Sequence, residues 1–348
     1  MKYWDTIEGL TILPDSGREA HDDVEQNKHS TGPALAAIVV IPDSYDTVRC
    51  TISQLQGQTA AGQIEIVFIV PSQQQLSLDE SGLACFHSWH IVEVGTVTSI
   101  ARAFAAGIGH AHAPVVALTE DHSFPDANWA ELLIAAHRQP WAAVGPSMRN
   151  GNPDTMLSWA DFYQAYGEWS QPISSQAVRH LPGHNSSYKR DILLTYGKQL
   201  EVLMQAESVL HRHLRAQGHE LLLESGTCTS HLNFASWSSW IPARFYTGRQ
   251  FAATWAIAWS WYRRLLFTAA APLIPWVRLW RIQRHVRRGQ TCSFLIRLLP
   301  AMLAGLIMEG LGQMVGYAAG AGDSIEKVAK YEFHRVKQTK QMGQEISN

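Results

Sequence analysis

The sequence of 348 residues contains few cysteines and none of the usual signs of export. Its four cysteines, Cys50, Cys85, Cys228 and Cys292, lie far apart and lack the short spacings of metal-binding motifs. We therefore expect free thiols in a reducing compartment. Residues 1–15 have neither a basic start nor a long apolar core, so the sequence predicts no signal peptide.

Acidic residues are absent from a long internal stretch. Residues 225–308 contain no aspartate or glutamate, but they include ten arginines and seven tryptophans. A basic, Trp-rich and otherwise apolar segment is typical of binding to an anionic membrane surface. Nucleic acid is the competing partner, but it would not explain the flanking apolar runs, so we expect no nucleic acid to bind.

No apolar run in this region clearly spans a membrane. The uncharged stretch 298–308 is well short of the roughly 20 residues that a spanning helix needs. This length favours interfacial or re-entrant helices over spanning ones, although spanning helices stay open as an alternative.

Short apolar runs alternate with helical patterns through the first 150 residues. This alternation predicts an α/β fold with a doubly wound, mostly parallel sheet. We expect strands at 34–42, 64–70, 89–94, 115–118 and 141–146, and helices at 45–56, 99–112 and 129–138. Farther along we expect helices at 156–166, 189–196 and 202–217, a strand at 221–224, and a loop or short strand at 227–233.

The run 115–118 is followed directly by Glu120, Asp121 and His122. Ionisable groups at the end of a buried strand are costly to desolvate without a partner. In open α/β sheets the carboxyl ends of the strands are where ligands bind. Oxygen and imidazole ligands there suit Mg²⁺ or Mn²⁺, and either ion would suit a diphosphate. The alternative is an acidic cap on the helix that begins near Asn128.

Several motifs follow one another in a recognisable order. Residues 37–42 form an apolar strand, 51–58 fit the pattern "TI-SL--Q", and 101–107 resemble "ARN-G". Pro125 and Trp129 follow the acidic motif, and residues 206–218 resemble "ED--L---L---G". Over residues 34 to 250 the chain thus resembles the family 2 glycosyltransferases of the GT-A fold. The segment from Glu309 to Tyr317 resembles a membrane-associated tail of some bacterial members.

The resemblance implies roles for individual residues. It places Asp121, His122 and His231 at the metal, and Glu207 as the catalytic base. It implies that the nucleotide-sugar donor is bound by Pro42, Asp43, Tyr45, Arg102, Glu120, Gly183, His184 and Asn185. For His184, capping a loop is an equal alternative.

The implied chemistry agrees with these residue types. A divalent cation would neutralise the charge of a leaving diphosphate, and a base must take the proton of the acceptor hydroxyl. Glu207 lies among apolar helix residues, where burial would raise its pKa; an exposed helix acid is the alternative. Direct attack by the activated hydroxyl predicts inversion at the anomeric carbon.

Two departures from the family pattern leave the nucleotide and the activity open. Pro71 and Ser72 stand where an aspartate usually holds the base or ribose, and the metal motif begins with Glu120 and ends with His122. A non-catalytic GT-A scaffold that binds a membrane or a partner is therefore the alternative function. A nucleotidyltransferase would normally show a Gly-rich loop after the first strand, and residues 43–46 contain no glycine.

Other aromatic and basic residues have two interpretations each. Trp237, Trp240, Arg244 and Arg249 would contact an acceptor or the membrane, or the tryptophans would simply pack in the interior. His211, His213 and His219 are expected in solvent. His110 and His112 are expected to close a helix, where imidazolium suits the dipole.

These observations predict four segments. Residues 1–33 form a polar N-terminal segment, 34–247 the GT-A-like domain, 248–323 a basic, Trp-rich helical region associated with a membrane, and 324–348 a charged tail. The expected partners are a nucleotide-sugar donor, a lipid-linked or saccharide acceptor and a membrane surface. We expect the protein on the cytoplasmic face of a membrane, peripheral or embedded in its interface.

Overall fold

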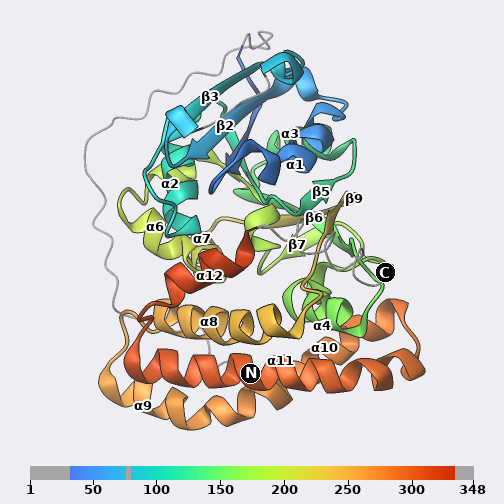
Figure 1. The fold of residues 1–348 in the computed structure, drawn as a ribbon, viewed down its shortest axis with the longest axis vertical. Helices are drawn as coiled ribbons and strands as arrows, with labels where there is room; N and C mark the ends of the chain where they lie inside the picture. Colours follow the sequence, from blue (N-terminus) through green and yellow to red (C-terminus); the bar gives the residue numbers. More distant parts are fainter. Residues whose placement is uncertain (1–31, 76–79, 334–348) are drawn as a thin grey trace.

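The computed structural model describes residues 32–75 and 80–333. The expectations for the N-terminus, including the missing signal peptide, and for most of the charged tail lie outside these ranges. Within them, the chain forms a sheet covered by helices and a separate helical layer at one end (Figure 1). The expected α/β class is therefore confirmed.

One sheet of nine strands forms the upper part of the described chain (Figure 1). Four strands pair in parallel in the order β3-β2-β1-β4: β1 (Leu35–Val40), β2 (Ile64–Val70), β3 (Ser88–Glu93) and β4 (Val115–Thr119). The sheet continues through β8 (Ser187–Lys189), β6 (Ala143–Asn150), β9 (Leu221–His231) and β5 (Ser123–Pro125), and β7 (Gln176–Val178) pairs with β9.

The sheet is mixed and not mostly parallel. The pairings β4–β8, β6–β8, β5–β9 and β7–β9 are antiparallel, which balances the four parallel ones. The strands β5, β7 and β8 have three residues each. Segments this short carry no periodic pattern, which explains why the sequence did not predict them.

Helices cover both faces of the parallel strands. Because side chains alternate along a strand, Ile38 of β1 packs with α2 (Ile100–His110), α6 (Gln199–Met204) and α7 (Glu207–Ala216). Val39 packs on the other face with α1 (Arg49–Gln56) and α3 (Trp129–His137). Burial of both faces explains why these strands are apolar throughout. The doubly wound arrangement is thus present around β1.

A helical layer lies below the sheet (Figure 1). It consists of α4 (Met156–Ala165), α8 (Trp237–Trp255), α9 (Trp261–Ala270), α10 (Ile274–Gly289) and α11 (Cys292–Ala319). The short helix α12 (Ser324–Glu332) lies between this layer and the sheet, and α5 (Arg190–Leu194) follows β8. The boundary expected at 247/248 falls inside α8, because the change in composition occurs within one continuous helix.

Two stretches of this layer, 261–289 and Cys292–Ala319, are long and apolar enough to cross a membrane by length and composition. One or two such helices are a weak indication, since buried helices pass the same test. The second stretch is longer than the uncharged run predicted from the sequence, because α11 continues through Arg297 and Glu309. Glu309 is buried, with ion pairs to Arg244 and Arg278.

The buried carboxylate Glu309 provides a test of how this layer is held together. We expect Glu309→Gln to lower the free energy of unfolding by about 3–5 kcal/mol, because two arginines lose their counter-ion in the interior. Chemical denaturation of the full chain measures the change. The control is Glu326→Gln on α12, where the side chain is exposed. Equal free energies of unfolding of the two variants would contradict a stabilising role for the ion pairs of Glu309.

Candidate metal centre and active site

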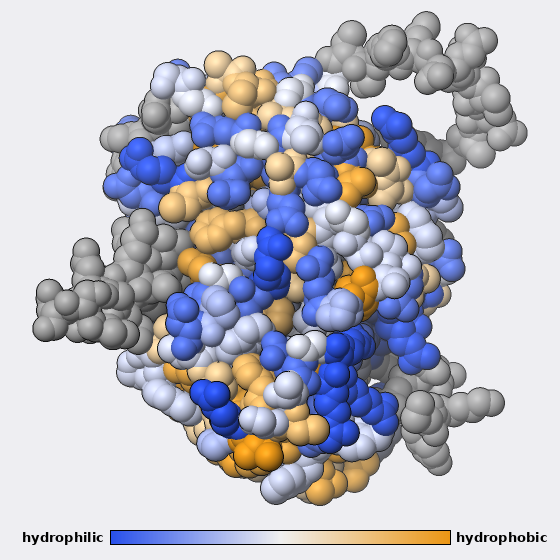
Figure 2. Space-filling model, turned by 90° about the vertical axis from the view of Figure 1, so that its right-hand side faces the viewer, coloured by the Kyte–Doolittle hydropathy of each residue, from blue (hydrophilic) through white to orange (hydrophobic). Residues whose placement is uncertain are grey.

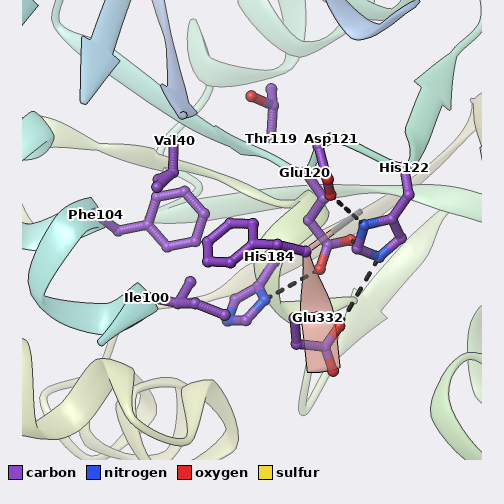
Figure 3. A pocket seen from close by; sticks show the side chains of 10 residues that line it. Val40, Ile100, Phe104, Thr119, Glu120, Asp121, His122, His184 and Glu332 are labelled. Carbon is purple, nitrogen blue, oxygen red and sulfur yellow. Dashed lines mark hydrogen bonds and ion pairs between the residues drawn. The ribbon is translucent and has the colours of Figure 1, made fainter. Parts of the chain in front are cut away.

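A cavity opens at the carboxyl ends of β1 and β4, the edge at which the sequence predicted a ligand (Figure 3). Its apolar side is formed by Val40, Ile100 and Phe104. Its polar side is formed by Thr119, Glu120, Asp121, His122 and His184, and the end of α12 adds Glu332 and Phe333. The last two residues were not predicted, because nothing in the local pattern of a C-terminal helix indicates that it reaches this edge.

Strand register brings two distant histidines together. Ser123 of β5 pairs with His231 of β9, and the backbone N–H of Leu232 donates to the carbonyl of His122 at 3.0 Å. The imidazole rings of His122 and His231 consequently meet at 4.7 Å between centroids. Their Nε2 atoms lie 3.9 and 3.5 Å from Oε2 of Glu120. Glu120, His122 and His231 thus form a group that could hold a metal ion.

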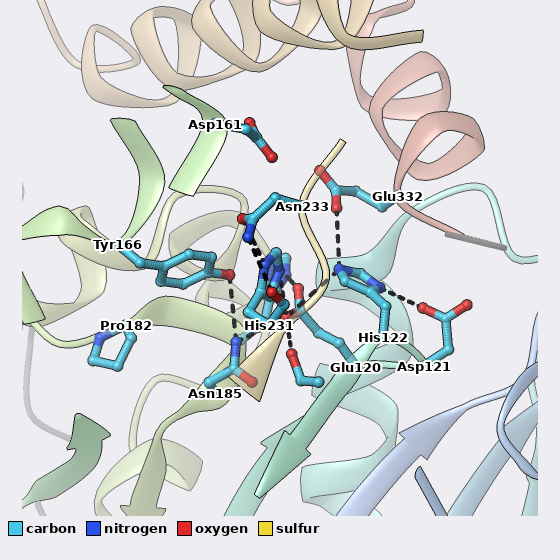
Figure 4. Close-up of polar contacts among 12 residues, drawn as sticks. Glu120, Asp121, His122, Asp161, Tyr166, Pro182, Asn185, His231, Asn233 and Glu332 are labelled. Carbon is cyan, nitrogen blue, oxygen red and sulfur yellow. Dashed lines mark hydrogen bonds and ion pairs between the residues drawn. The ribbon is translucent and has the colours of Figure 1, made fainter. Parts of the chain in front are cut away.

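In each ring, Nδ1, the nitrogen that does not face Glu120, lies beside a hydrogen-bond acceptor (Figure 4). Nδ1 of His122 lies 2.6 Å from Oδ1 of Asp121, and Nδ1 of His231 lies 3.0 Å from the amide oxygen of Asn233. When Nδ1–H is donated in this way, the neutral form of each ring could offer its Nε2 lone pair to a cation beside Glu120, as in histidines that bind metals. The buried Nε2 of His122 has no hydrogen-bond partner in the described structure. These residues therefore fit a divalent cation.

The same geometry places Asp121 differently from the prediction. Its carboxylate holds Nδ1 of His122, whereas the carboxylate that faces both Nε2 atoms belongs to Glu120. The metal role expected for Asp121 stays a prediction, and Glu120 is a second carboxylate suited to that role. Glu120 comes directly after β4, while Asp121 lies in the turn that leads to β5.

Glu120 is the centre of the polar network. Its Oε2 accepts hydrogen bonds from Ser123 Oγ at 2.9 Å and Asn185 Nδ2 at 2.8 Å, and its Oε1 lies 3.1 Å from Nδ1 of His184. Burial alone would raise the pKa of Glu120. The charge of His122 and the hydrogen bonds of His184 and His231 outweigh burial and hold the pKa well below its usual value. Glu120 is therefore ionised at neutral pH.

His184 connects this centre to Glu207. Its Nε2 lies 2.5 Å from Oε1 of Glu207, the first residue of α7. Although burial alone would lower the pKa of His184, Glu207 and Glu120 together raise it well above its usual value. His184 therefore contacts both carboxylates of the site, and its contact with the donor stays a prediction. The ring bridges two carboxylates and also packs on Phe104 at 5.3 Å.

The predicted rise in the pKa of Glu207 is wrong. Burial is the largest influence and raises the pKa, but the charge and hydrogen bond of His184 lower it further than burial raises it. The helix predicted over 202–217 is in fact two helices, α6 and α7. Glu207 consequently lies at a helix N-terminus, where a carboxylate is favoured. Gly183 faces it closely, since a Cβ there would lie 3.0 Å from Oε2 of Glu207.

The other residues expected at the donor are spread along the same edge. Pro42 and Asp43 follow β1, and Asp43 accepts a hydrogen bond from Thr47 Oγ1 at 2.7 Å. Tyr45 is buried, with its ring 6.5 Å from that of Phe68. Arg102 is exposed on α2. His184 and Asn185 contact Glu120, and Gly183 faces Glu207, while Pro42, Asp43, Tyr45 and Arg102 do not line the cavity.

Two of the residues expected at an acceptor or membrane are interior. Trp240 is fully buried, and its Nε1–H donates to Asp161 Oδ1 at 2.7 Å. Arg244 is buried and paired with Glu309. Both side chains therefore pack within the helical layer, which agrees with the interior alternative for Trp240 and corrects the outside contact expected of Arg244.

The other two residues of that set are more accessible. Trp237 is half exposed at the start of α8. Arg249 donates to the carbonyl of Gly320 at 3.0 Å and pairs with Asp323 at 3.6 Å. Trp237 is therefore the member of the set whose side chain is available for an outside contact.

Three histidines differ from expectation. His211 is fully buried instead of solvated, and its Nε2 lies 2.9 Å from the hydroxyl of Tyr188. Burial lowers the pKa of His211 to about 3. His213 is only partly exposed, and burial lowers its pKa. His112 lies beyond the end of α2, where Nδ1 contacts Glu65 at 2.7 Å.

No family model matches the chain, and no curated protein matches it. Among solved structures, it is similar to mannosyltransferase PcManGT from Pyrobaculum calidifontis in complex with GDP-Man and Mn²⁺. The likeness has 14% identity and a TM-score of 0.48, and covers 81% of this chain and 87% of that one. A likeness this distant shows neither the family nor the activity of this chain.

Proposed function

We propose that the protein is a divalent-metal-dependent glycosyltransferase that transfers a sugar from a nucleoside-diphosphate donor to a lipid-linked or saccharide acceptor. The observation that carries the proposal is the Glu120–His122–His231 group, which His184 connects to Glu207. A group that could hold the metal ion for the diphosphate and a carboxylate that could act as the base for the acceptor thus lie on opposite sides of the His184 ring. The proposed transfer uses both.

In the proposed reaction, Glu207 takes the proton from the acceptor hydroxyl while the hydroxyl oxygen attacks the anomeric carbon. The bond from that carbon to the diphosphate oxygen breaks, and the nucleoside diphosphate leaves with both bonding electrons. Glu120, His122 and His231 would hold a divalent cation, which would supply Lewis-acid neutralisation of the leaving charge. A single displacement of this kind inverts the anomeric centre, and analysis of the product anomer tests it.

The donor set favours Mn²⁺ over Mg²⁺ in this proposal. Mg²⁺ prefers an octahedron of oxygen ligands and loses water reluctantly, whereas two of the three protein ligands here are imidazoles. Asp121 and Asn233 orient those imidazoles and are positioning residues.

A nucleotide panel tests the proposal. Ligands that bind only the folded chain raise its melting temperature. We expect one nucleoside diphosphate to raise the melting temperature with Mn²⁺ and to lose the effect with chelator. UDP, GDP and their sugar conjugates form the panel, and GDP-mannose is included because the similar structure contains it. A panel without any metal-dependent shift would defeat the proposal and favour the non-catalytic scaffold.

We also propose that α9 and α10 rest on the cytoplasmic face of a membrane. The exposed apolar side chains of these helices and of the short turn between them, called here the apolar face, are Trp261, Tyr262, Leu265, Leu266, Leu273, Trp276, Val277 and Trp280. Figure 2 shows apolar and strongly polar side chains together at the end formed by the C-terminal helices. Arginines flank the face, and the guanidinium of Arg284 lies 3.8 Å from the ring centre of Trp280. Such a surface suits anionic lipid headgroups.

Vesicle binding provides the corresponding prediction. We expect the full chain to bind vesicles containing an anionic phospholipid more tightly than neutral vesicles. The double variant Trp276→Ser/Trp280→Ser is expected to bind about 10-fold more weakly or worse, because two large apolar side chains no longer leave water. Leu194→Ser, which changes an exposed leucine on α5, is the matched control. Equal binding by all three proteins would contradict the membrane assignment.

A further inference from the structure

A second group of ligand-type side chains lies at the opposite edge of the sheet. Glu65 is the second residue of β2, His90 lies on the neighbouring strand β3, and His112 follows α2. These three residues come from separate elements, yet one ligand atom of each lies within 4.8 Å of the others. Because parallel strands share their amino ends, this edge is remote from the Glu120 centre.

The register of β2 and β3 and the position of α2 bring these three side chains together. Glu65 pairs with Ser88 in the β2–β3 register, so Glu65 and His90 point to the same side of the sheet. That side is covered by α2, which ends at His110 over the amino edge. The partial negative charge of a helix C-terminus favours a cation nearby.

The carboxylate of Glu65 is fixed and fully buried. Backbone N–H groups of His112 and Ala113 donate to its Oε2, each at 2.9 Å. Its Oε1 faces two imidazoles, with Nδ1 of His112 at 2.7 Å and Nδ1 of His90 at 3.4 Å. Two nitrogens directed at one buried oxygen form a converging set of ligands.

These distances agree with a tetrahedral metal site. Two ligands bound at roughly 2.0–2.1 Å in a tetrahedron lie roughly 3.4 Å apart. The His90 separation already has this value, and the exposed His112 ring needs only a small rotation to reach it. Because the His112 side chain is exposed, solvent could supply a water as the fourth ligand.

We propose that Glu65, His90 and His112 form a second, Zn²⁺-type metal site, independent of the proposed catalytic centre. Two imidazoles and one carboxylate suit Zn²⁺ better than Mg²⁺ or Ca²⁺. By tying β2, β3 and the end of α2 together, the ion stabilises the amino edge of the sheet.

The test measures Zn²⁺ binding by calorimetry on chelator-stripped, full-length protein. Glu120→Gln is the parent, because it removes the carboxylate of the other centre. His112→Asn is introduced into it, with His110→Asn as the matched control two residues away. We expect one equivalent of Zn²⁺ to bind to the parent and the control. We expect binding at least about 100-fold weaker in His112→Asn, since a lost direct ligand costs no less than a lost second-shell partner.

Co²⁺ provides a second readout. Tetrahedral Co²⁺ gives visible absorption bands, which we expect in the parent and the control but not in His112→Asn. The His112 side chain is about three-quarters exposed, so its replacement is compatible with folding, and circular dichroism verifies this. Equal Zn²⁺ affinity in His112→Asn and His110→Asn, or a parent that binds none, would overturn the site. Neither measurement involves a nucleotide, so the result is independent of the proposed transferase activity.

Discussion

Glu120→Gln is expected to lower kcat/KM for sugar transfer at least about 100-fold and to remove the effect of Mn²⁺ on nucleotide binding. The substitution keeps the shape of the side chain but removes the charge that faces both Nε2 atoms. Loss of even an outer partner of a metal ligand costs about 10–100-fold, so the loss of a direct ligand costs more. Initial rates at several Mn²⁺ concentrations measure the effect.

Two further variants are compared with Glu120→Gln. Asp126→Asn is the matched control, since this acid lies six residues away and pairs with Arg149 at 2.6 Å outside the centre. We expect it to retain full Mn²⁺ dependence. Asp121→Asn should fall between the two, because Asp121 orients His122 but does not face the metal position. If Asp121→Asn were more damaging than Glu120→Gln, the original assignment of Asp121 as the ligand would be right.

The local elements could be predicted from the sequence because their signal is local. The run 64–70 coincides with β2 residue for residue, and 115–118 differs from β4 by one residue. Continuous apolar runs indicate strands buried on both faces, which the two cores confirm. The position of the site followed from the same reasoning, since acids after a buried strand must lie at its carboxyl edge.

The partners within the site could not be predicted in this way. His231 reaches His122 only through the β5–β9 register, and β5 is too short to carry a pattern. The break between α6 and α7 turns Glu207 toward His184 and reverses the expected direction of its pKa shift. The burial of Trp240 depends on Asp161, 79 positions away in the chain. In each case, the position of the side chain depends on contacts with residues far along the chain, which the local sequence does not reveal.

The largest effect on chemistry alone is expected from Glu207→Gln. This change removes the base but keeps the size of the side chain and leaves Glu120 in place. General-base catalysis contributes about 10²–10⁴-fold, so we expect kcat to fall by that factor while donor binding stays within about 2-fold. Rapid-quench rates and nucleotide titrations separate the two quantities. A parallel loss of donor affinity would instead assign Glu207 to donor binding.

The pH profile of His184→Gln tests how the base is tuned. In the native chain the pKa of Glu207 is lowered, so the carboxylate is ionised and active from neutral pH down into the acid range. His184 has a raised pKa and stays charged through neutral pH, which maintains this effect. Without His184, burial is no longer outweighed, and the pKa of Glu207 rises. We therefore expect the acid limb of the rate profile to move to higher pH in His184→Gln, whereas an unmoved limb would show that His184 does not tune the base.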